Sequence, residues 1–209
     1  MNKNKLWFKK ILGDAALAMV DEIVRDSKHH RYIEDKEIEL IRKGIKIGII
    51  KNKGNFFILK TDSSKKYDAF TLNREYFTQF ATLISLITEY RYPLKDCQFE
   101  YNLMDICVFR NKKPFIYVEA KTTDYSAKKL YKEINEKYSK NIDSFKNEPD
   151  RGNDALRKAK YIFKDRPEYF YLVTPKHKLA FGIKYTGKGF SLNKITDIPS
   201  FELKNKQKI

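Results

Sequence analysis

Two short apolar runs separated by a polar turn constrain the fold of this chain more than any other feature. The runs cover residues 104–109 and 115–121, with residues 110–114 between them. Because side chains alternate between the two faces of a strand, Glu119 and Lys121 share one face of the second run while apolar residues share the other. The pattern predicts a β-hairpin within a buried sheet, with two charged side chains on one face.

This hairpin is expected to bring two carboxylates together. If Phe109 faces Phe115 across the turn, the same register sets Asp105 opposite Glu119. Facing carboxylates repel each other and destabilise strand pairing, so we expect a cation between them. A divalent ion such as Mg²⁺ fits, since hard cations prefer carboxylate and carbonyl oxygens. Lys121 lies about 7 Å beyond Glu119 along the strand, within reach of a water or a phosphate oxygen beside the ion.

Such a group of residues suits phosphodiester hydrolysis. A metal ion lowers the pKa of a water molecule and stabilises charge on the phosphate, and a neighbouring lysine orients the nucleophile or shares the developing charge. The alternative is a surface hairpin in which Asp105, Glu119 and Lys121 balance one another. The register of Asp105, the apolar opposite face and the positive charge of the chain favour the chemical interpretation.

The chain is strongly basic, with 43 Lys and Arg against 27 Asp and Glu, a net charge of +16 over 209 residues. This excess predicts a polyanionic partner, although Lys-rich codon usage in an AT-rich genome would also produce it. No apolar run approaches the ~20 residues of a membrane helix, and residues 1–20 lack the pattern of a signal peptide. Two cysteines are too few for a disulfide framework, so we expect a cytoplasmic protein without a membrane partner.

Periodicity divides the chain into an N-terminal extension (1–72), a main domain (73–199) and a basic tail (200–209). The extension is expected to hold a helix over 7–25 and a small antiparallel β-meander built from β-rich runs over 37–42, 45–50 and 55–60. In the main domain we expect a helix from an Asn73 N-cap to Tyr90, three strands within 98–121, helices over 126–145 and 154–163, and strands over 169–173 and 179–185. This order predicts the α/β (α+β) class, with a mixed central sheet flanked by helices.

The spacing of Asp105 and, fourteen positions later, Glu119-Ala120-Lys121 resembles the PD-(D/E)XK nuclease superfamily. More narrowly, residues 89–93, 99–101, 105–109 and 116–121 are similar to the nuclease domain at the N-terminus of type I restriction endonuclease subunits. The resemblance covers about residues 73–183. It implies a restriction-endonuclease-like fold and Mg²⁺-dependent DNA cleavage, with Mn²⁺ able to substitute. One departure is Arg157, which stands where the family has a glutamine four residues before Tyr161.

By position, the resemblance implies that Asp105, Glu119 and Lys121 are catalytic. Asp105 and Glu119 would be metal ligands, joined by the Ala120 carbonyl and by Glu75 from the helix before the sheet. The alternative for Glu75 is an acidic residue that only favours the first turn of its helix. DNA contacts are expected from a set of basic residues and one tyrosine: Lys128, Lys129, Lys132, Arg157, Lys158, Lys160 and Tyr161.

Three further tyrosines, Tyr125, Tyr131 and Tyr138, are interleaved with the lysines and could stack on unpaired bases, with packing as the alternative.

We therefore expect a Mg²⁺-dependent DNA endonuclease that acts in restriction, phage defence or mobile-element processing. The chain has no phosphate-binding loop of the Gly-x-x-x-x-Gly-Lys-Ser/Thr type, so any translocation would come from a helicase or specificity partner. Paired cuts in duplex DNA usually need two active sites, which makes a homodimer a further expectation. Two alternatives stay open: a basic nucleic-acid-binding module with an inactive nuclease fold, and a junction- or single-strand-specific nuclease.

Overall fold

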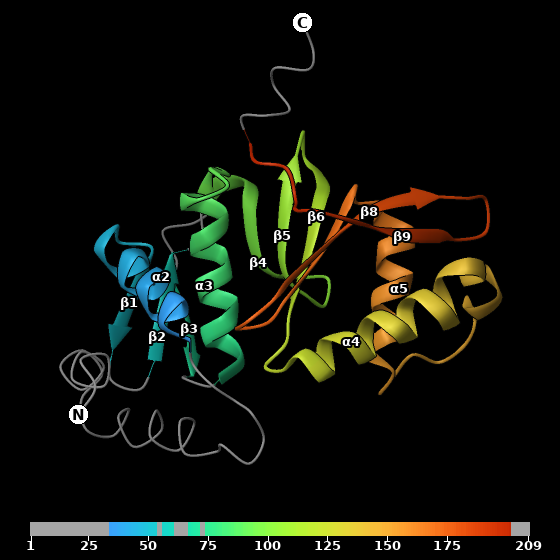
Figure 1. The fold of residues 1–209 in the computed structure, drawn as a ribbon, viewed down its shortest axis with the longest axis horizontal. Coiled ribbons are helices and arrows are strands. Elements are labelled where there is room, and N and C mark those ends of the chain that lie inside the picture. The colour runs from blue at the N-terminus through green and yellow to red at the C-terminus, as the bar shows by residue number, and fades with distance from the viewer. Residues whose placement is uncertain (1–33, 54–55, 61–66, 72–73, 202–209) are drawn as a thin grey trace, which may run out of the picture.

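The computed structural model of the chain is a mixed α/β protein built on a six-stranded sheet (Figure 1). It describes residues 34–53, 56–60, 67–71 and 74–201. The helix expected over 7–25, the Asn73 cap and most of the basic tail lie outside these ranges. Within the described ranges, no helix is long and apolar enough to cross a bilayer.

The central sheet has the strand order β4-β5-β6-β7-β8-β9. Its strands are β4 (Cys97–Tyr101), β5 (Met104–Arg110), β6 (Lys113–Ala120), β7 (Tyr169–Val173), β8 (Lys178–Tyr185) and β9 (Phe190–Ile195). Neighbouring strands are antiparallel except β6 and β7, which are parallel. The sequence therefore predicted the mixed sheet correctly but missed its last strand, β9.

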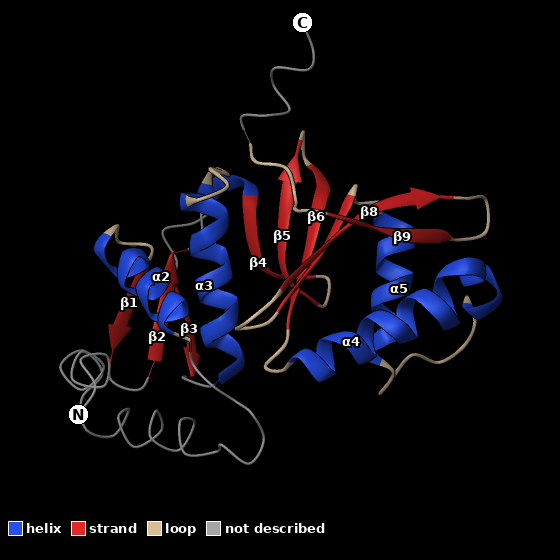
Figure 2. Cartoon of the chain, viewed as in Figure 1, coloured by secondary structure: helices blue, strands red, loops and turns tan. Residues whose placement is uncertain are grey.

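Helices cover both faces of this sheet (Figure 2). One face packs on α3 (Arg74–Thr88) through the buried side chains Ile106, Val108, Ile116 and Val118. The connection from β6 to β7 covers the other face with α4 (Asp124–Lys132), the π-helical η3 (Glu133–Tyr138), the 3₁₀ segment η4 (Ser139–Phe145) and α5 (Asp154–Asp165). The two apolar clusters that result hold the sheet between two layers of helices, as expected.

The N-terminal part differs from the expectation at its start. Residues 37–42 and 45 and 46, predicted as strand, belong to α2 (Asp35–Lys46). Ile38 and Leu40 alternate like a strand, but Ile38 and Ile41 are buried at helical spacing, and Glu34 and Glu37 form a capping box. An antiparallel meander follows as β1 (Ile50–Lys53), β2 (Phe56–Lys60) and β3 (Tyr67–Thr71). Of the predicted runs only 55–60 matches a strand, β2; the run over 45–50 reaches β1 only at Ile50, and β3 was not predicted.

Helix α2 packs against α3. Glu37 and Arg74, both buried, form an ion pair with Nη2 2.9 Å from Oε2, and Thr78 Oγ1 donates to the other carboxylate oxygen at 2.7 Å. Ile41 of α2 belongs to the same apolar cluster as Ile84 of α3. Helix α2, which belongs to the predicted N-terminal extension, therefore shares a hydrophobic core with the main domain. The domain boundary at residue 72 stays a prediction.

Candidate active site

The β5–β6 hairpin brings Asp105 and Glu119 to adjacent positions at one end of the ladder. Three paired positions have the predicted register: Ile106 with Val118, Cys107 with Tyr117, and Val108 with Ile116. One further step in this register leads to Asp105 and Glu119. Both side chains belong to the sheet face that α4 and α5 cover, because Cys107 and Tyr117 on that face lie in the apolar cluster of α5.

At the turn, the predicted register is wrong. Phe109 pairs with Pro114 rather than with Phe115, and a bulge separates Val108 from Phe109. The physical reason is the turn itself, which has only Asn111 and Lys112 at its centre, with φ of 51° and 61°. A two-residue turn with positive φ at both positions matches the twist of the strands, and the bulge absorbs the one-residue offset. The carboxylate pair lies beyond the bulge and keeps its register.

Asp105 is held by the backbone of the facing strand. Its Oδ2 accepts a hydrogen bond from the Ala120 N–H at 2.6 Å. Since the N–H and C=O of one strand residue point to the same neighbouring strand, the Ala120 carbonyl also faces β5. Burial and the charge of Glu119 raise the pKa of Asp105 well above its usual range. A carboxylate in this position is costly to ionise and would be stabilised by a cation.

Glu119 lies at the centre of the site and contacts both of its lysines. Its side chain is 1% exposed, and each carboxylate oxygen meets a lysine ammonium. Lys121 Nζ lies 2.5 Å from Oε1, and Lys158 Nζ lies 2.7 Å from Oε2. The ammonium groups of Lys121 and Lys158 therefore compensate the buried negative charge of the Glu119 carboxylate.

Lys158 is buried in the site, so its predicted role in contacting DNA is wrong. It was predicted to contact the DNA backbone, but it is 3% exposed and points from α5 into the site. Besides Glu119, its ammonium donates to the Leu103 carbonyl at 2.6 Å. A buried lysine needs such partners because an unpaired ammonium away from water is very costly. Its neighbours Ala155, Ala159 and Ile162 show that this is the buried face of α5.

Lys121 lies between the buried pair and solvent. Its Nζ is 3.8 Å from Oδ2 of Asp154, a half-exposed residue in the first turn of α5. Burial alone would lower the pKa of Lys121, but the carboxylates of Glu119, Asp105 and Asp154 outweigh this and raise its pKa. Lys121 therefore stays an ammonium at neutral pH, suited to hold an anion rather than to act as a general base.

Asp154 is a member of the site that the sequence analysis missed. Its Oδ1 lies 3.5 Å from Lys158 Nζ, so one carboxylate approaches both site lysines. The available signal was the i, i+4 spacing of Asp154 and Lys158 behind the Asn153 cap of α5. The site thus gathers three carboxylates and two ammonium groups, with the Arg157 guanidinium 3.7 Å from Asp154 as a third cation.

The donor set suits a hard divalent ion. Mg²⁺ is usually bound by one or two carboxylates together with water, and Asp105, Glu119 and the Ala120 carbonyl supply oxygen only. Among the described residues, no three His, Cys, Asp or Glu side chains form a metal-binding group on their own. Water and substrate oxygens would therefore complete the coordination. A cation bound beside the two carboxyls would offset the charge of Glu119, which together with burial raises the pKa of Asp105.

Glu75 is not brought to this site. It is exposed in the first turn of α3, whose buried face packs on the opposite side of the sheet from Glu119. In the described part of the chain, no hydrogen bond or ion pair joins Glu75 to Asp105, Glu119 or Lys121. Asp154 approaches the pair through Lys121 and Lys158.

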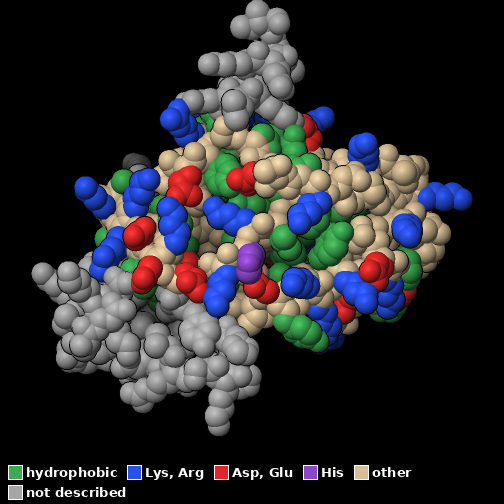
Figure 3. Space-filling model, viewed as in Figure 1, with side chains coloured by type: hydrophobic (Ala, Val, Ile, Leu, Met, Phe, Trp, Pro, Cys, Tyr) green, Lys and Arg blue, Asp and Glu red, His purple; other side chains and the backbone are tan. Residues whose placement is uncertain are grey.

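The predicted DNA-contacting residues divide into exposed and engaged groups. Lys128, Lys129 and Lys132 are exposed on α4. The others make contacts within the chain: Lys160 Nζ donates to the Glu148 carbonyl at 2.7 Å, Arg157 lies 3.7 Å from Asp154, and the partly buried Tyr161 packs under Lys164. In the space-filling view, Lys and Arg are spread over the whole visible face with Asp and Glu among them (Figure 3). Charge alone therefore does not outline one DNA-binding patch on that face.

The three interleaved tyrosines differ in exposure. Tyr138 is buried and accepts a hydrogen bond from Asn153 Nδ2 at 2.7 Å, which agrees with the packing alternative rather than with base stacking. Tyr131 already stacks on Phe181, with ring centroids 4.7 Å apart. Tyr125 is 78% exposed in the first turn of α4 and is the member of the three that presents its ring to solvent.

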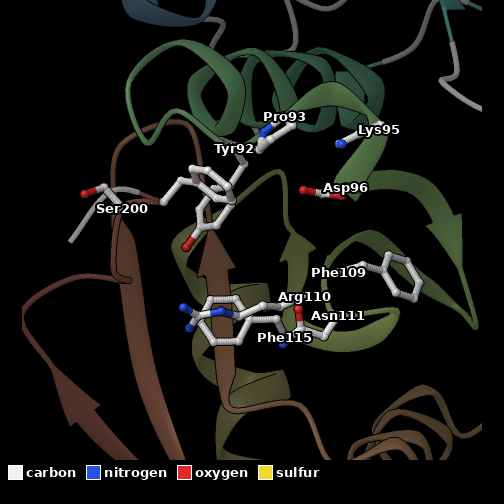
Figure 4. Close-up of a pocket in the computed structure, with 10 residues that line it drawn as sticks. Tyr92, Pro93, Lys95, Asp96, Phe109, Arg110, Asn111, Phe115 and Ser200 are labelled. Carbon is white, nitrogen blue, oxygen red and sulfur yellow. The ribbon is translucent and has the colours of Figure 1, made fainter. Parts of the chain in front are cut away.

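A separate pocket of about 290 Å³ lies at the other end of the hairpin, beside η2 (Leu94–Asp96) (Figure 4). The Arg110 guanidinium lies 5.0 Å from the centre of the Phe115 ring, and Tyr92 and Phe201 add further aromatic lining. Arg110 is five residues from Asp105 on β5, about 17 Å by strand rise. The pocket is therefore distinct from the carboxylate–lysine site.

Comparison with protein-family models, with curated proteins and with solved structures gave no match. The assignment of function therefore rests on the residues of the site. Three residues predicted from the sequence, Asp105, Glu119 and Lys121, lie together where β5 begins and β6 ends. Lys158 and Asp154 complete the group.

Proposed function

We propose that this chain is a Mg²⁺-dependent DNA endonuclease with a restriction-endonuclease-like fold. The observation that carries the proposal is the juxtaposition of Asp105 from β5 with Glu119 from β6 and with Lys121, the residue that follows β6. A buried pair of carboxylates with an ammonium beside it binds a metal ion and a phosphate side by side. The net charge of +16 supports a polyanionic substrate.

Asp105, Glu119 and the Ala120 carbonyl are the groups that would hold the metal. Bound there, Mg²⁺ would lower the pKa of an attacking water and neutralise charge on the phosphate. Lys121, whose raised pKa keeps it protonated, shares the negative charge that develops on the phosphate oxygens. Lys158 fixes the Glu119 carboxylate through its 2.7 Å contact and thereby positions one metal ligand.

A binding module without catalysis is a second candidate, and one observation favours it. Both oxygens of Glu119 are paired with lysines, so Lys121 must move away from Oε1 before that oxygen can bind a metal. If Lys121 keeps its contact with Oε1 of Glu119, no metal binds there, and the basic chain binds DNA without cleaving it. The two candidates therefore differ in cleavage and agree in binding.

A panel of DNA substrates distinguishes the candidates. We expect the purified protein to cleave linear duplex DNA in Mg²⁺, with EDTA abolishing the reaction, and to cut a fork, a four-way junction and single-stranded DNA no faster. The measurement is the initial rate on end-labelled substrates of one length, with binding followed by gel shift. A strong preference for the junction or the single strand would replace the proposal with a structure-specific nuclease. Salt-sensitive binding with no cleavage of any substrate would favour the binding module.

A further inference from the structure

The turn after β7 carries a histidine–aspartate pair that the chemistry proposed above does not use. His177 Nδ1 lies 2.7 Å from Oδ2 of Asp124, the first residue of α4. Thr174 Oγ1 donates to the other carboxylate oxygen at 2.5 Å, and the His177 backbone N–H donates to the same hydroxyl oxygen at 2.9 Å. With Nδ1 engaged and 65% of the side chain exposed, Nε2 is the ring nitrogen available to a ligand.

The pair lies at the carboxyl ends of the parallel strands β6 and β7, the same end of the sheet as the candidate active site. Strands β6 and β7 are parallel, and the Lys121 N–H donates to the Val173 carbonyl at 2.8 Å. Asp124 follows Lys121 by three residues, a span of at most about 11 Å. His177 follows Val173 by four residues across a tight turn. In α/β sheets, ligands bind at this carboxyl edge of the parallel strands.

The pair and its neighbour Lys128 can offer hydrogen-bond donors to an anionic ligand. Burial would raise the pKa of Asp124, but hydrogen bonds from Thr174 and His177 and the nearby charge of Lys128 bring it below its usual range. In its protonated form the His177 ring donates through Nδ1 to Asp124 and leaves Nε2–H as a donor for an anionic ligand. Lys128 is exposed one turn further along α4 and presents a second cation to the same edge.

We propose that His177 contacts a DNA phosphate next to the scissile one, with Asp124 and Thr174 as the residues that position its ring. This inference rests on the proposed nuclease function and adds a substrate-binding residue to it. A phosphate is the group that fits, because a charged N–H donor fixes the register of the backbone and carries no information about base sequence. A merely structural pair would close the turn without affecting substrate binding.

The test compares wild type with His177→Ala, Asp124→Asn and Lys188→Ala. Lys188 is exposed beyond the other end of β8, so its loss controls for one positive charge. We measure kcat and KM on a duplex oligonucleotide in Mg²⁺, and the salt dependence of the DNA dissociation constant in EDTA. The binding measurement is made at mildly acidic pH, which favours the imidazolium form of a histidine.

We expect His177→Ala to raise KM about tenfold with kcat little changed, and to reduce the slope of log affinity against log salt by about 1. Asp124→Asn should act in the same direction with a smaller effect, and Lys188→Ala should match wild type. A His177→Ala enzyme with wild-type KM and salt slope would overturn the inference while leaving the nuclease function intact. A wild-type protein that neither binds nor cleaves DNA would instead remove the proposed function, and this inference with it.

Discussion

Asp105→Asn is expected to reduce Mg²⁺-dependent cleavage by more than about 100-fold and, at the same time, to make the metal-free protein more stable. The loss of a direct metal ligand should exceed the 10- to 100-fold cost of losing an outer partner of a metal site. The gain in stability comes from the raised pKa of Asp105, which reflects its burial and the charge of Glu119. An amide cannot ionise, and its oxygen can still accept the hydrogen bond from the Ala120 N–H.

The sign of the stability change follows from proton linkage. A carboxyl whose folded pKa is raised above its unfolded value contributes stability that is present below the unfolded pKa, about 3.9 for Asp. That contribution is lost as the pH rises through the folded pKa, and each pKa unit is worth about 1.4 kcal/mol. Thermal melts without metal should therefore show the advantage of Asp105→Asn growing from acidic to neutral pH.

The matched control is Asp143→Asn, which removes one exposed carboxylate from η4, a segment that contributes no residue to the site. It should leave both the cleavage rate and the pH dependence of the melting temperature close to those of wild type. Addition of Mg²⁺ should raise the melting temperature of wild type and of this control, since a ligand that binds only the folded state stabilises it. An Asp105→Asn protein that cleaves like wild type, or melts lower than wild type without metal, contradicts the interpretation.

Glu119→Gln is expected to act in the opposite direction on stability, lowering the free energy of unfolding by about 3 kcal/mol. Removal of one partner from a buried ion pair leaves the other charge uncompensated, which typically costs 3–5 kcal/mol. Here the group that loses its buried counter-ion is the Lys158 ammonium, which is 3% exposed and 2.7 Å from Glu119 and would keep the Leu103 carbonyl and the more distant Asp154. Two neighbouring carboxyls of one site thus give variants of opposite stability.

The double variant Glu119→Gln/Lys158→Met tests whether this coupling is real. Since it removes both charges, it should recover a large part of the loss, and a double-mutant cycle measures the interaction from denaturant unfolding. Glu136→Gln, in an exposed pair with Lys132, should cost less than about 1 kcal/mol and serves as the control. A double variant no more stable than Glu119→Gln alone would mean that Lys158 does not depend on Glu119.

The alternation of apolar and polar residues was enough to predict the β5–β6 hairpin. Alternation along 104–109 and 115–121 set the strands and the shared face of Glu119 and Lys121, because both depend on residues close in sequence. The register near Asp105 was predicted from a Phe109–Phe115 pair that does not form, and it agrees because the bulge restores the same offset. The error at Phe109 came from the turn, where a two-residue loop needed a bulge to match the rest of the ladder. The signal for β9 was also present, since Phe190 and Leu192 are buried and alternate with exposed Ser191 and Asn193.

The remaining differences depend on contacts between distant segments. The β-rich run over 37–42 was predicted as a strand, and only the packing of α2 on α3 shows that a helical face is buried there. Likewise, Lys158 looks like other lysines of α5 in the sequence, and its burial is decided by the orientation of that helix over the sheet. Asp154 joins the site for the same reason.

The most direct test of the account is the nicking of supercoiled plasmid by the purified protein in Mg²⁺, Mn²⁺ or EDTA, with Lys121→Ala and Asp143→Asn alongside. We predict open-circular product with either metal and none in EDTA. Asp143→Asn should behave as wild type, and Lys121→Ala should lose most of the activity because it lacks the ammonium that shares charge on the phosphate. Nicking that persists in EDTA, or that Lys121→Ala retains in full, would contradict a metal-dependent site built on Asp105, Glu119 and Lys121.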